Sequence, residues 1–291
     1  MSVTTRLREL LAQPDLLVAP GAYDALSARL IAQAGFPAVY MTGFGTAAST
    51  LGQPDVGLLT MSEMVSRAAA LAAVVGDRPL IADADTGYGN PINVRRTIRE
   101  YERAGVAAVH IEDQIWPKKC GHMEGKQVIP VDEMVQKIRA AVDARQDPDF
   151  VIIARTDANA VYGLADALHR GRAYREAGAD VIFIEAPRSI EELRTIAQAF
   201  PDVPLLFNWA ESDKTPLLSL EEIHTLGFKL VIFPVSLLFA ATRTLLDLLD
   251  LLKQGQTPTA FAEHTVTFAH FTDQIGLPDI QALERRYGIP Q

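Results

Sequence analysis

Carboxylate side chains recur at the ends of two apolar segments that the sequence predicts to be neighbouring strands. Asp83 and Asp85 are two residues apart, so on a strand they point to the same face. His110 and Glu112 repeat this spacing in the next apolar segment. Carboxylates this close raise one another's pKa unless a cation neutralises them, and an all-oxygen ligand set suits Mg²⁺ or Mn²⁺ better than zinc. These residues predict a divalent-cation site, in which His110 either orients a carboxylate or is an ordinary buried histidine.

The single cysteine, Cys120, lies in a polar segment that follows Glu112 and contains Gly121 and Gly125. A lone cysteine is most often an inert core residue. Here Lys118, Lys119 and His122 flank the thiol, and neighbouring cations favour its thiolate form. We therefore expect Cys120 to take part in proton transfer or to act as a nucleophile.

Polar residues also end later strands of the predicted sheet. Arg155 ends the fifth, and its planar guanidinium suits a carboxylate or phosphate, although a structural ion pair with Glu185 or Asp157 is the alternative. Asn208 ends the seventh strand. The glycine-bearing turn over residues 42–46 follows the second strand, and its backbone N–H groups can hold an anionic oxygen. Because ligands of α/β folds bind at the C-terminal ends of the strands, we expect these groups to face one substrate.

Eight short runs rich in Val, Ile and Leu alternate with segments of helical period. The predicted strands are 16–19, 38–42, 80–85, 107–112, 150–155, 181–185, 205–208 and 230–234. The predicted helices are 22–35, 62–76, 93–105, 132–145, 164–178, 190–200, 220–227 and 237–254. The strands are apolar almost throughout, as strands buried on both faces are. The alternation predicts an α/β fold, a (β/α)8 TIM-type barrel; a doubly wound sheet needs only about five or six strands.

A tail remains after the eighth predicted helix. We assign residues 1–254 to the catalytic barrel and 255–291 to a C-terminal helical extension with two weak helices, at 260–272 and 279–287. The tail carries apolar side chains that must be buried, among them Phe261, Val266, Phe268 and Phe271. A partner subunit and the chain's own barrel are equally suitable places for them.

The composition narrows the class of protein. The 291 residues include 27 Lys and Arg against 36 Asp and Glu, a net charge of −9, which argues against a nucleic-acid surface. No apolar run reaches the roughly 18 residues of a membrane span, and the N-terminus has no signal-peptide core. One cysteine allows no intrachain disulfide. We expect a cytoplasmic protein with a small-molecule partner and no membrane or nucleic-acid partner.

With these residues in place, the chain resembles the isocitrate lyase/phosphoenolpyruvate mutase superfamily over roughly residues 15–250. The most specific motif is Lys-Lys-Cys-Gly-His at 118–122. The segments Asp-Ala-Asp-Thr-Gly-Tyr-Gly at 83–89, His-Ile-Glu-Asp-Gln at 110–114 and Ala-Arg-Thr-Asp-Ala at 154–158 stand in the family's order. The match is nearest to the 2-methylisocitrate lyase, 2,3-dimethylmalate lyase and petal-death-protein branch.

The resemblance implies roles for individual residues. It implies Mg²⁺, or Mn²⁺, near five residues: Asp83, Asp85, Asp55, His110 and Glu112. It implies that Cys120 is the catalytic acid on a gating loop, within a catalytic set of Cys120, Arg155, Tyr40 and Lys118. It places a further set around the substrate: Thr42, Gly43, Phe44, Gly121, His122, Arg155, Glu185 and Asn208. It also implies a homotetramer in which the last barrel helix is swapped between subunits.

Two positions at which this sequence differs from methylisocitrate lyases narrow the range of expected substrates. Methylisocitrate lyases carry an Arg in the stretch that here reads Ser-Leu-Leu-Phe, residues 236–239, and another where this chain has Phe268. Replacing Arg by Phe removes the partner of a carboxylate and leaves an apolar wall. We therefore expect cleavage of a 2-hydroxy (alkyl)malate-type dicarboxylate to a 2-oxoacid and a carboxylate. The alternatives are carboxyphosphonoenolpyruvate mutase-like P–C bond formation, methylisocitrate cleavage, oxaloacetate cleavage, and a non-catalytic binding protein on the same scaffold.

Overall fold

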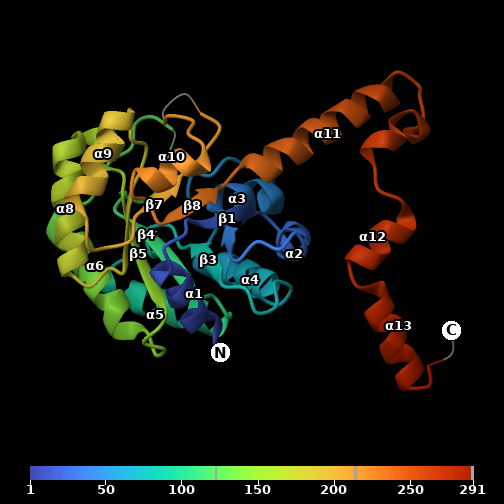
Figure 1. The fold of residues 1–291 in the computed structure, drawn as a ribbon, viewed down its shortest axis with the longest axis horizontal. Coiled ribbons are helices and arrows are strands. Elements are labelled where there is room, and N and C mark those ends of the chain that lie inside the picture. Colours follow the sequence, from blue (N-terminus) through green and yellow to red (C-terminus); the bar gives the residue numbers. More distant parts are fainter. Residues whose placement is uncertain (122, 213–214, 290–291) are drawn as a thin grey trace. The chain divides into compact units, whose positions relative to one another are not determined.

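The structure, a computed structural model, describes residues 1–121, 123–212 and 215–289. Eight parallel strands form a nearly closed barrel (Figure 1), which confirms the predicted (β/α)8 fold. The strands are β1 Leu17–Ala22, β2 Val39–Met41, β3 Leu80–Asp83, β4 Ala108–Glu112, β5 Val151–Thr156, β6 Val181–Ile184, β7 Leu206–Asn208 and β8 Leu230–Phe233. They follow the order β6-β5-β4-β3-β2-β1-β8-β7, and a single bridge between Ile182 and Leu205 joins β6 to the segment that enters β7.

A helix follows each strand, as the helical periodicity predicts. These helices are α2 Ala25–Gln33, α4 Met61–Ala72, α5 Pro91–Arg103, α6 Val131–Ala144, α8 Leu164–Glu176, α9 Ile190–Ala199, α10 Leu220–Thr225 and α11 Ser236–Lys253. Capping boxes begin several of them; in α4 the Thr60 hydroxyl accepts from Glu63 N while the Glu63 carboxylate accepts from Thr60 N. The sequence analysis did not predict three further helices, α1 Val3–Ala12, α3 Gly43–Leu51 and α7 Ala158–Val161.

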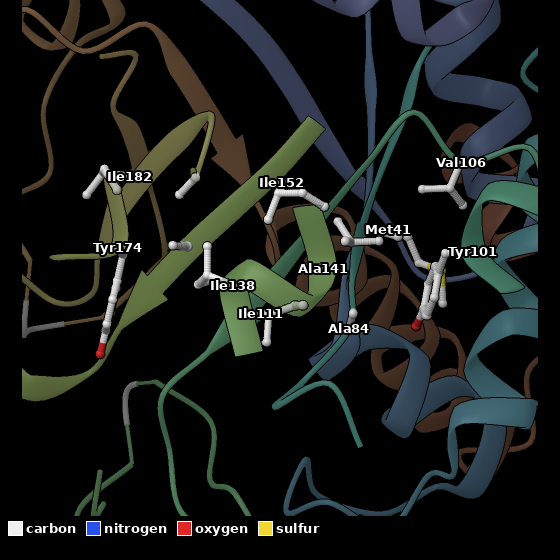
Figure 2. Packing of buried hydrophobic residues seen from close by; sticks show 14 of the residues in the cluster. Met41, Ala84, Tyr101, Val106, Ile111, Ile138, Ala141, Ile152, Tyr174 and Ile182 are labelled. Atoms are coloured by element: carbon white, nitrogen blue, oxygen red, sulfur yellow. The ribbon is translucent and has the colours of Figure 1, made fainter. Parts of the chain in front are cut away.

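The core has an inner and an outer layer, because successive strand side chains point to opposite faces. Tyr40, Ile153 and Phe183 are among the buried side chains of the inner layer. In the outer layer the strands pack on the helices; Figure 2 shows Ile111 and Ile152 from β4 and β5 in the same cluster as Ile138 from α6. Burying such aliphatic side chains contributes about 1.5–3 kcal/mol each. The strands are therefore a rigid base for the residues at their ends.

The chain divides into two compact units, Met1–Leu237 and Leu238–Gln291. The second unit holds most of α11, the 3₁₀ helix η1 Pro258–His264, and helices α12 Phe268–Gln274 and α13 Leu277–Arg286. The single helix predicted over 260–272 is wrong, since η1 ends before α12 begins. Among the residues that the structure describes, no helix combines the length and apolarity that crossing a membrane requires.

Candidate active site

The register of the sheet brings the predicted site residues together. Asp83 at the end of β3 is the neighbour of His110 on β4, and Glu112 at the end of β4 is the neighbour of Arg155 on β5. All strands are parallel, so these ends lie at the C-terminal mouth of the barrel. Asp83, His110, Glu112 and Arg155 therefore form one continuous group.

Asp85 joins this group from a turn after β3 and not from the strand itself. The expectation that it lies on a strand beside Asp83 is wrong, because β3 ends at Asp83 and Asp85 has a left-handed backbone with φ 47°. The Asp85 N–H donates to Asp83 Oδ1 at 2.9 Å, which closes the turn locally. The turn directs the Asp85 carboxylate to Lys118, while Asp83 stays beside His110.

Lys118 pairs with two carboxylates in the mouth of the barrel. Its Nζ lies 2.5 Å from Asp55 Oδ1 and 2.8 Å from Asp85 Oδ1, and the lysine side chain is 3% exposed. Burial opposes the charged form, but the carboxylates of Asp85 and Asp55 outweigh it and raise the pKa of Lys118 well above its usual value. Burial raises the pKa of Asp85 to about 6, against the opposing effect of Lys118. Lys118 thus balances negative charge in the site, whereas the sequence analysis had treated it chiefly as a neighbour of the thiol.

Tyr40 and His110 form a buried hydrogen-bonded pair. Tyr40 Oη and His110 Nε2 are 2.8 Å apart, and the same nitrogen lies 3.6 Å from Asp83 Oδ1. Burial raises the pKa of Tyr40 well above 10 and lowers the pKa of His110. Both groups are therefore neutral near pH 7, and His110 serves to position Tyr40 and Asp83.

Arg155 is held by the carboxylates of three residues. Its Nε and Nη2 donate to Asp157 at 2.9 and 3.1 Å, and Nε lies 3.2 Å from Glu112 Oε2. Nη2 also lies 3.7 Å from Glu185 Oε2. The ion pair weighed as an alternative for Arg155 is therefore present, but it fixes the guanidinium at the mouth of the barrel. Burial would lower the pKa of Arg155, but Asp157 and Glu112 raise it, so the charge is permanent.

Glu185 and Asn208 form a second polar pair, just after β6 and at the end of β7. Asn208 Nδ2 donates to the two carboxylate oxygens of Glu185 at 3.2 and 3.1 Å. Asn208 Oδ1 is buried and has no hydrogen-bond partner in the part of the chain that is described. This carbonyl can accept a hydrogen bond from a ligand.

The segment 42–46 begins a helix; the prediction that it is only a turn is wrong. Thr42 caps α3, with its hydroxyl accepting from Gly45 N at 3.2 Å. Gly43 lies so close to Asp83 that a Cβ there would overlap the Asp83 carboxylate, and Phe44 is partly buried. The backbone N–H groups of the first helical turn retain the predicted capacity to hold an anion.

The segment between Gln114 and Val128, called the Cys120 loop, is anchored to the barrel mouth at several points. At its base, Gln114 and Val128 form an antiparallel bridge. The Gln114 side chain donates to Lys119 O at 2.7 Å and accepts from Lys119 N at 3.0 Å, and Cys120 N donates to Asp55 O at 3.1 Å. Gly121 is so close to Arg155 and Glu185 that a Cβ would lie 2.7 Å from the Glu185 carboxyl carbon. The predicted site residue His122 lies outside the described residues.

The sequence analysis did not select Gln114 and Asp113, which hydrogen-bond to residues that support the site. Gln114 links Glu112 to the Cys120 loop, because its Nε2 also donates to Glu112 Oε1 at 2.9 Å. Asp113 accepts from Thr156 Oγ1 and Tyr174 Oη, both at 2.7 Å. Both residues belong to the His-Ile-Glu-Asp-Gln motif at 110–114. Their position next to Glu112 is the sequence signal that could have identified them.

The donor set suits a hard divalent cation with few protein ligands. Within the described ranges, no group of three or more His, Cys, Asp or Glu side chains is arranged to hold a metal by itself. Asp85 Oδ1 is buried beside Lys118 Nζ yet has no hydrogen bond of good geometry. Mg²⁺ is commonly bound through one or two carboxylates and completes its shell with water and substrate oxygens. Asp83 and Asp85 fit that pattern, although Asp85 is also paired with Lys118. The other three predicted ligands, Asp55, His110 and Glu112, have protein partners too.

Comparison with known proteins identifies the family. The phosphoenolpyruvate phosphomutase family model matches residues 7–252. The 2,3-dimethylmalate lyase of Eubacterium barkeri is 50% identical over 287 residues, covering 99% of each chain. The chain belongs to the isocitrate lyase/phosphoenolpyruvate mutase superfamily. The predicted membership is therefore confirmed.

Solved structures of other superfamily members share this barrel. Oxaloacetate acetylhydrolase in complex with 3,3-difluorooxalacetate superposes with a TM-score of 0.93 at 41% identity, covering 99% of this chain and 97% of that one. Phosphonopyruvate hydrolase in complex with oxalate and Mg²⁺ superposes with a TM-score of 0.89 at 32% identity, covering 99% of both chains. The superfamily is metal-dependent, and the carbon–carbon lyase class predicted for this chain fits its relatives.

Proposed function

We propose that this carbon–carbon lyase cleaves a 2-hydroxydicarboxylate of the alkylmalate type into a 2-oxoacid and a carboxylate. The observation that carries the proposal is the seating of Gly121 against both Arg155 and Glu185. In the proposed complex these two groups, which are 3.7 Å apart, face the bound diacid beneath the Cys120 loop. A thiol above a bound enolate is the arrangement that proton delivery requires.

Substrate binding follows from the charges at the mouth. Arg155 binds the carboxylate of the 2-hydroxyacid end, in an orientation set by its two hydrogen bonds to Asp157. Asn208, Glu185 and the first turn of α3 around Gly43 contact the other carboxylate-bearing fragment. Thr42 and Phe44 belong to the wall of the same end. The substrate thus lies between the ends of β2, β5 and β7.

Mg²⁺ is the proposed cofactor, with Mn²⁺ as its substitute, and Asp83 and Asp85 would hold it. When bound, it supplies Lewis-acid stabilisation of the negative charge that develops on substrate oxygens. Lys118 keeps the neighbouring carboxylates compatible with a dianionic substrate, because its ammonium neutralises part of their charge.

The reaction needs one base and one acid. The base removes the hydroxyl proton at C2, the C2–C3 bond breaks, and its electron pair becomes the enolate of the departing carboxylate fragment. The candidate bases are Tyr40 and a carboxylate of the site. Because burial keeps Tyr40 a neutral phenol that is hydrogen-bonded to His110, the carboxylate is the better proton acceptor. Cys120 then donates its proton to the enolate carbon, and the closed loop excludes water from that step.

The substrate assignment rests on the residues that replace arginines. Phe239 and Phe268 offer no charge to a third carboxylate, which disfavours methylisocitrate and favours an alkyl-substituted diacid. We further propose a cytoplasmic homotetramer in which the last barrel helix swaps between subunits, with residues 255–291 as an oligomer contact. The apolar side chains exposed on α11, such as Leu245 and Leu249, support that role.

One panel of substrates tests the proposed function. The purified protein is mixed with Mg²⁺ and, in turn, 2-alkylmalates, 2,3-dimethylmalate, oxaloacetate and methylisocitrate, and 2-oxoacid release is followed with a coupled dehydrogenase. Oxaloacetate cleavage is read separately as oxalate formation. We expect release from an alkylmalate; a protein that cleaves only methylisocitrate or oxaloacetate contradicts the substrate assignment.

The phosphonate alternative has an observation of its own, since the matching family model is that of a phosphomutase. Phosphorus NMR of a carboxyphosphonoenolpyruvate mixture distinguishes it. A new P–C resonance with no diacid cleavage would replace the lyase proposal.

A further inference from the structure

One buried lysine has no part in the chemistry proposed above. Lys126 stands at the C-terminal side of the Cys120 loop, and its side chain is only 2% exposed. Its Nζ donates to Asp157 Oδ1 at 2.7 Å and also to the backbone carbonyl of Gly121. Burying an ammonium group is costly unless it is paired, so these two contacts account for its position.

Asp157 connects this lysine to the substrate-binding arginine. Its Oδ1 accepts from both Lys126 and Arg155 Nη2, and its Oδ2 accepts from Arg155 Nε. The cations of Arg155 and Lys126 hold the pKa of Asp157 well below its usual value, despite burial. The carboxylate that aims Arg155 is therefore the same group that anchors Lys126.

The hydrogen bond from Lys126 to Gly121 O links the upper part of the loop to its base. Below Lys126 the two sides of the loop are paired, since Ile115 N donates to Gln127 O at 2.9 Å and Ile129 N donates to Asp113 O at 2.8 Å. These pairings fix the base of the loop, and Gly121 lies above them. Because Lys126 bonds to Gly121 O, it ties the residue next to Cys120 to the fixed base and to Asp157.

We propose that Lys126 is a positioning residue that latches the Cys120 loop against Arg155. The latch is the chain Gly121 O, Lys126 Nζ, Asp157 carboxylate and Arg155 guanidinium. The position of the loop and the aim of Arg155 then depend on one shared carboxylate. The effect on turnover rests on the proposed role of Cys120, whereas the effect on loop position does not.

The test uses Cys120 as a reporter, because it is the chain's single cysteine and its alkylation reads one position. The rate of its reaction with iodoacetamide is measured in the free protein and in Lys126→Met, over a range of pH. Asp157 stays paired with Arg155 in this variant, so the barrel is expected to fold, which a thermal melt checks. We expect alkylation to accelerate by about tenfold, the order of change for losing a hydrogen bond to a charged group.

A matched variant controls for the loss of a loop charge. Lys119→Met removes a lysine of the same loop whose Nζ donates to the Glu124 carbonyl at an exposed position. Because a cation beside the thiol favours the thiolate, we expect Lys119→Met to slow alkylation and not to accelerate it, whereas Lys126→Met lowers kcat more than it changes KM. Lys126→Arg, which keeps a buried cationic donor, should restore part of the slow alkylation.

Two results overturn the latch. One is an unchanged alkylation rate in Lys126→Met, and the other is an equal acceleration in Lys119→Met. If the parent protein has no lyase activity, the proposed function fails, yet the alkylation comparison still decides the latch.

Discussion

The ammonium nitrogen of Lys118 lies 2.5 Å from Asp55 Oδ1, although the two residues are 63 positions apart in the chain. Two residues later, Cys120 N donates to the backbone carbonyl of the same Asp55. One aspartate therefore holds the Cys120 loop both through its side chain and through its backbone. The loop's position is coupled to the charge balance of the carboxylate site.

Removing the ammonium group should make stability depend on a divalent cation. Lys118→Met leaves Asp55 and Asp85 buried without their counter-charge, at a cost on the order of 3–5 kcal/mol for a broken buried pair. We expect a lower melting temperature without metal and a larger rise on adding Mg²⁺ than the parent shows, because the ion replaces the missing charge. Thermal melts with EDTA and with Mg²⁺ measure this. Equal Mg²⁺ shifts in both proteins would contradict the assignment of Asp85 to the cation.

The thiol should matter for turnover and not for binding. Cys120→Ser keeps the size of the side chain but supplies a much weaker acid, so we expect kcat to fall by roughly 10²–10⁴-fold, the usual contribution of a positioned acid. Titration calorimetry with Mg²⁺ and the diacid should give nearly the parent affinity. Normal turnover by this variant would rule out the acid role.

Closure of the loop should not tolerate a side chain at its point of contact. In Gly121→Ala the new Cβ would lie 2.7 Å from the Glu185 carboxyl carbon, so either the loop or the Arg155 and Glu185 side chains must shift. A displacement near 1 Å costs about 100-fold in rate when it misplaces a reacting group. We expect that loss in kcat with a melting temperature close to the parent's. A fully active variant would show that the closed position is not the one used in turnover.

Metal removal should abolish activity reversibly. We expect EDTA treatment to stop turnover and added Mg²⁺ to restore it, with Mn²⁺ substituting. Asp85→Asn should raise the Mg²⁺ concentration needed for half-maximal activity at least by the roughly 10–100-fold associated with losing an outer-shell partner. An unchanged Mg²⁺ requirement in this variant would remove Asp85 from the proposed ligands.

Local sequence signals predicted most elements within a few residues and failed where backbone chemistry is unusual. The strand predicted through Asp85 is wrong because that residue adopts a left-handed backbone, which is uncommon for a residue other than glycine. The segment after β2 looked like a turn because it has two glycines, yet Thr42 caps a helix there. At position 43 a glycine is required because a Cβ would overlap the Asp83 carboxylate. Only the folded structure shows that these two residues are in contact.

The sequence by itself determined the barrel, the residues at its mouth and the family. These follow from periodicity, strand order and short motifs, which are properties of neighbouring positions. Tertiary structure alone decided how the charges are shared. Arg155 is aimed by Asp157, Lys118 balances Asp55 and Asp85, and Lys126 reaches Gly121 and Asp157. Each charged group had several possible partners along the chain, and closing the eight strands into a ring brings specific ones within bonding distance in a buried site, where an unpaired charge is costly.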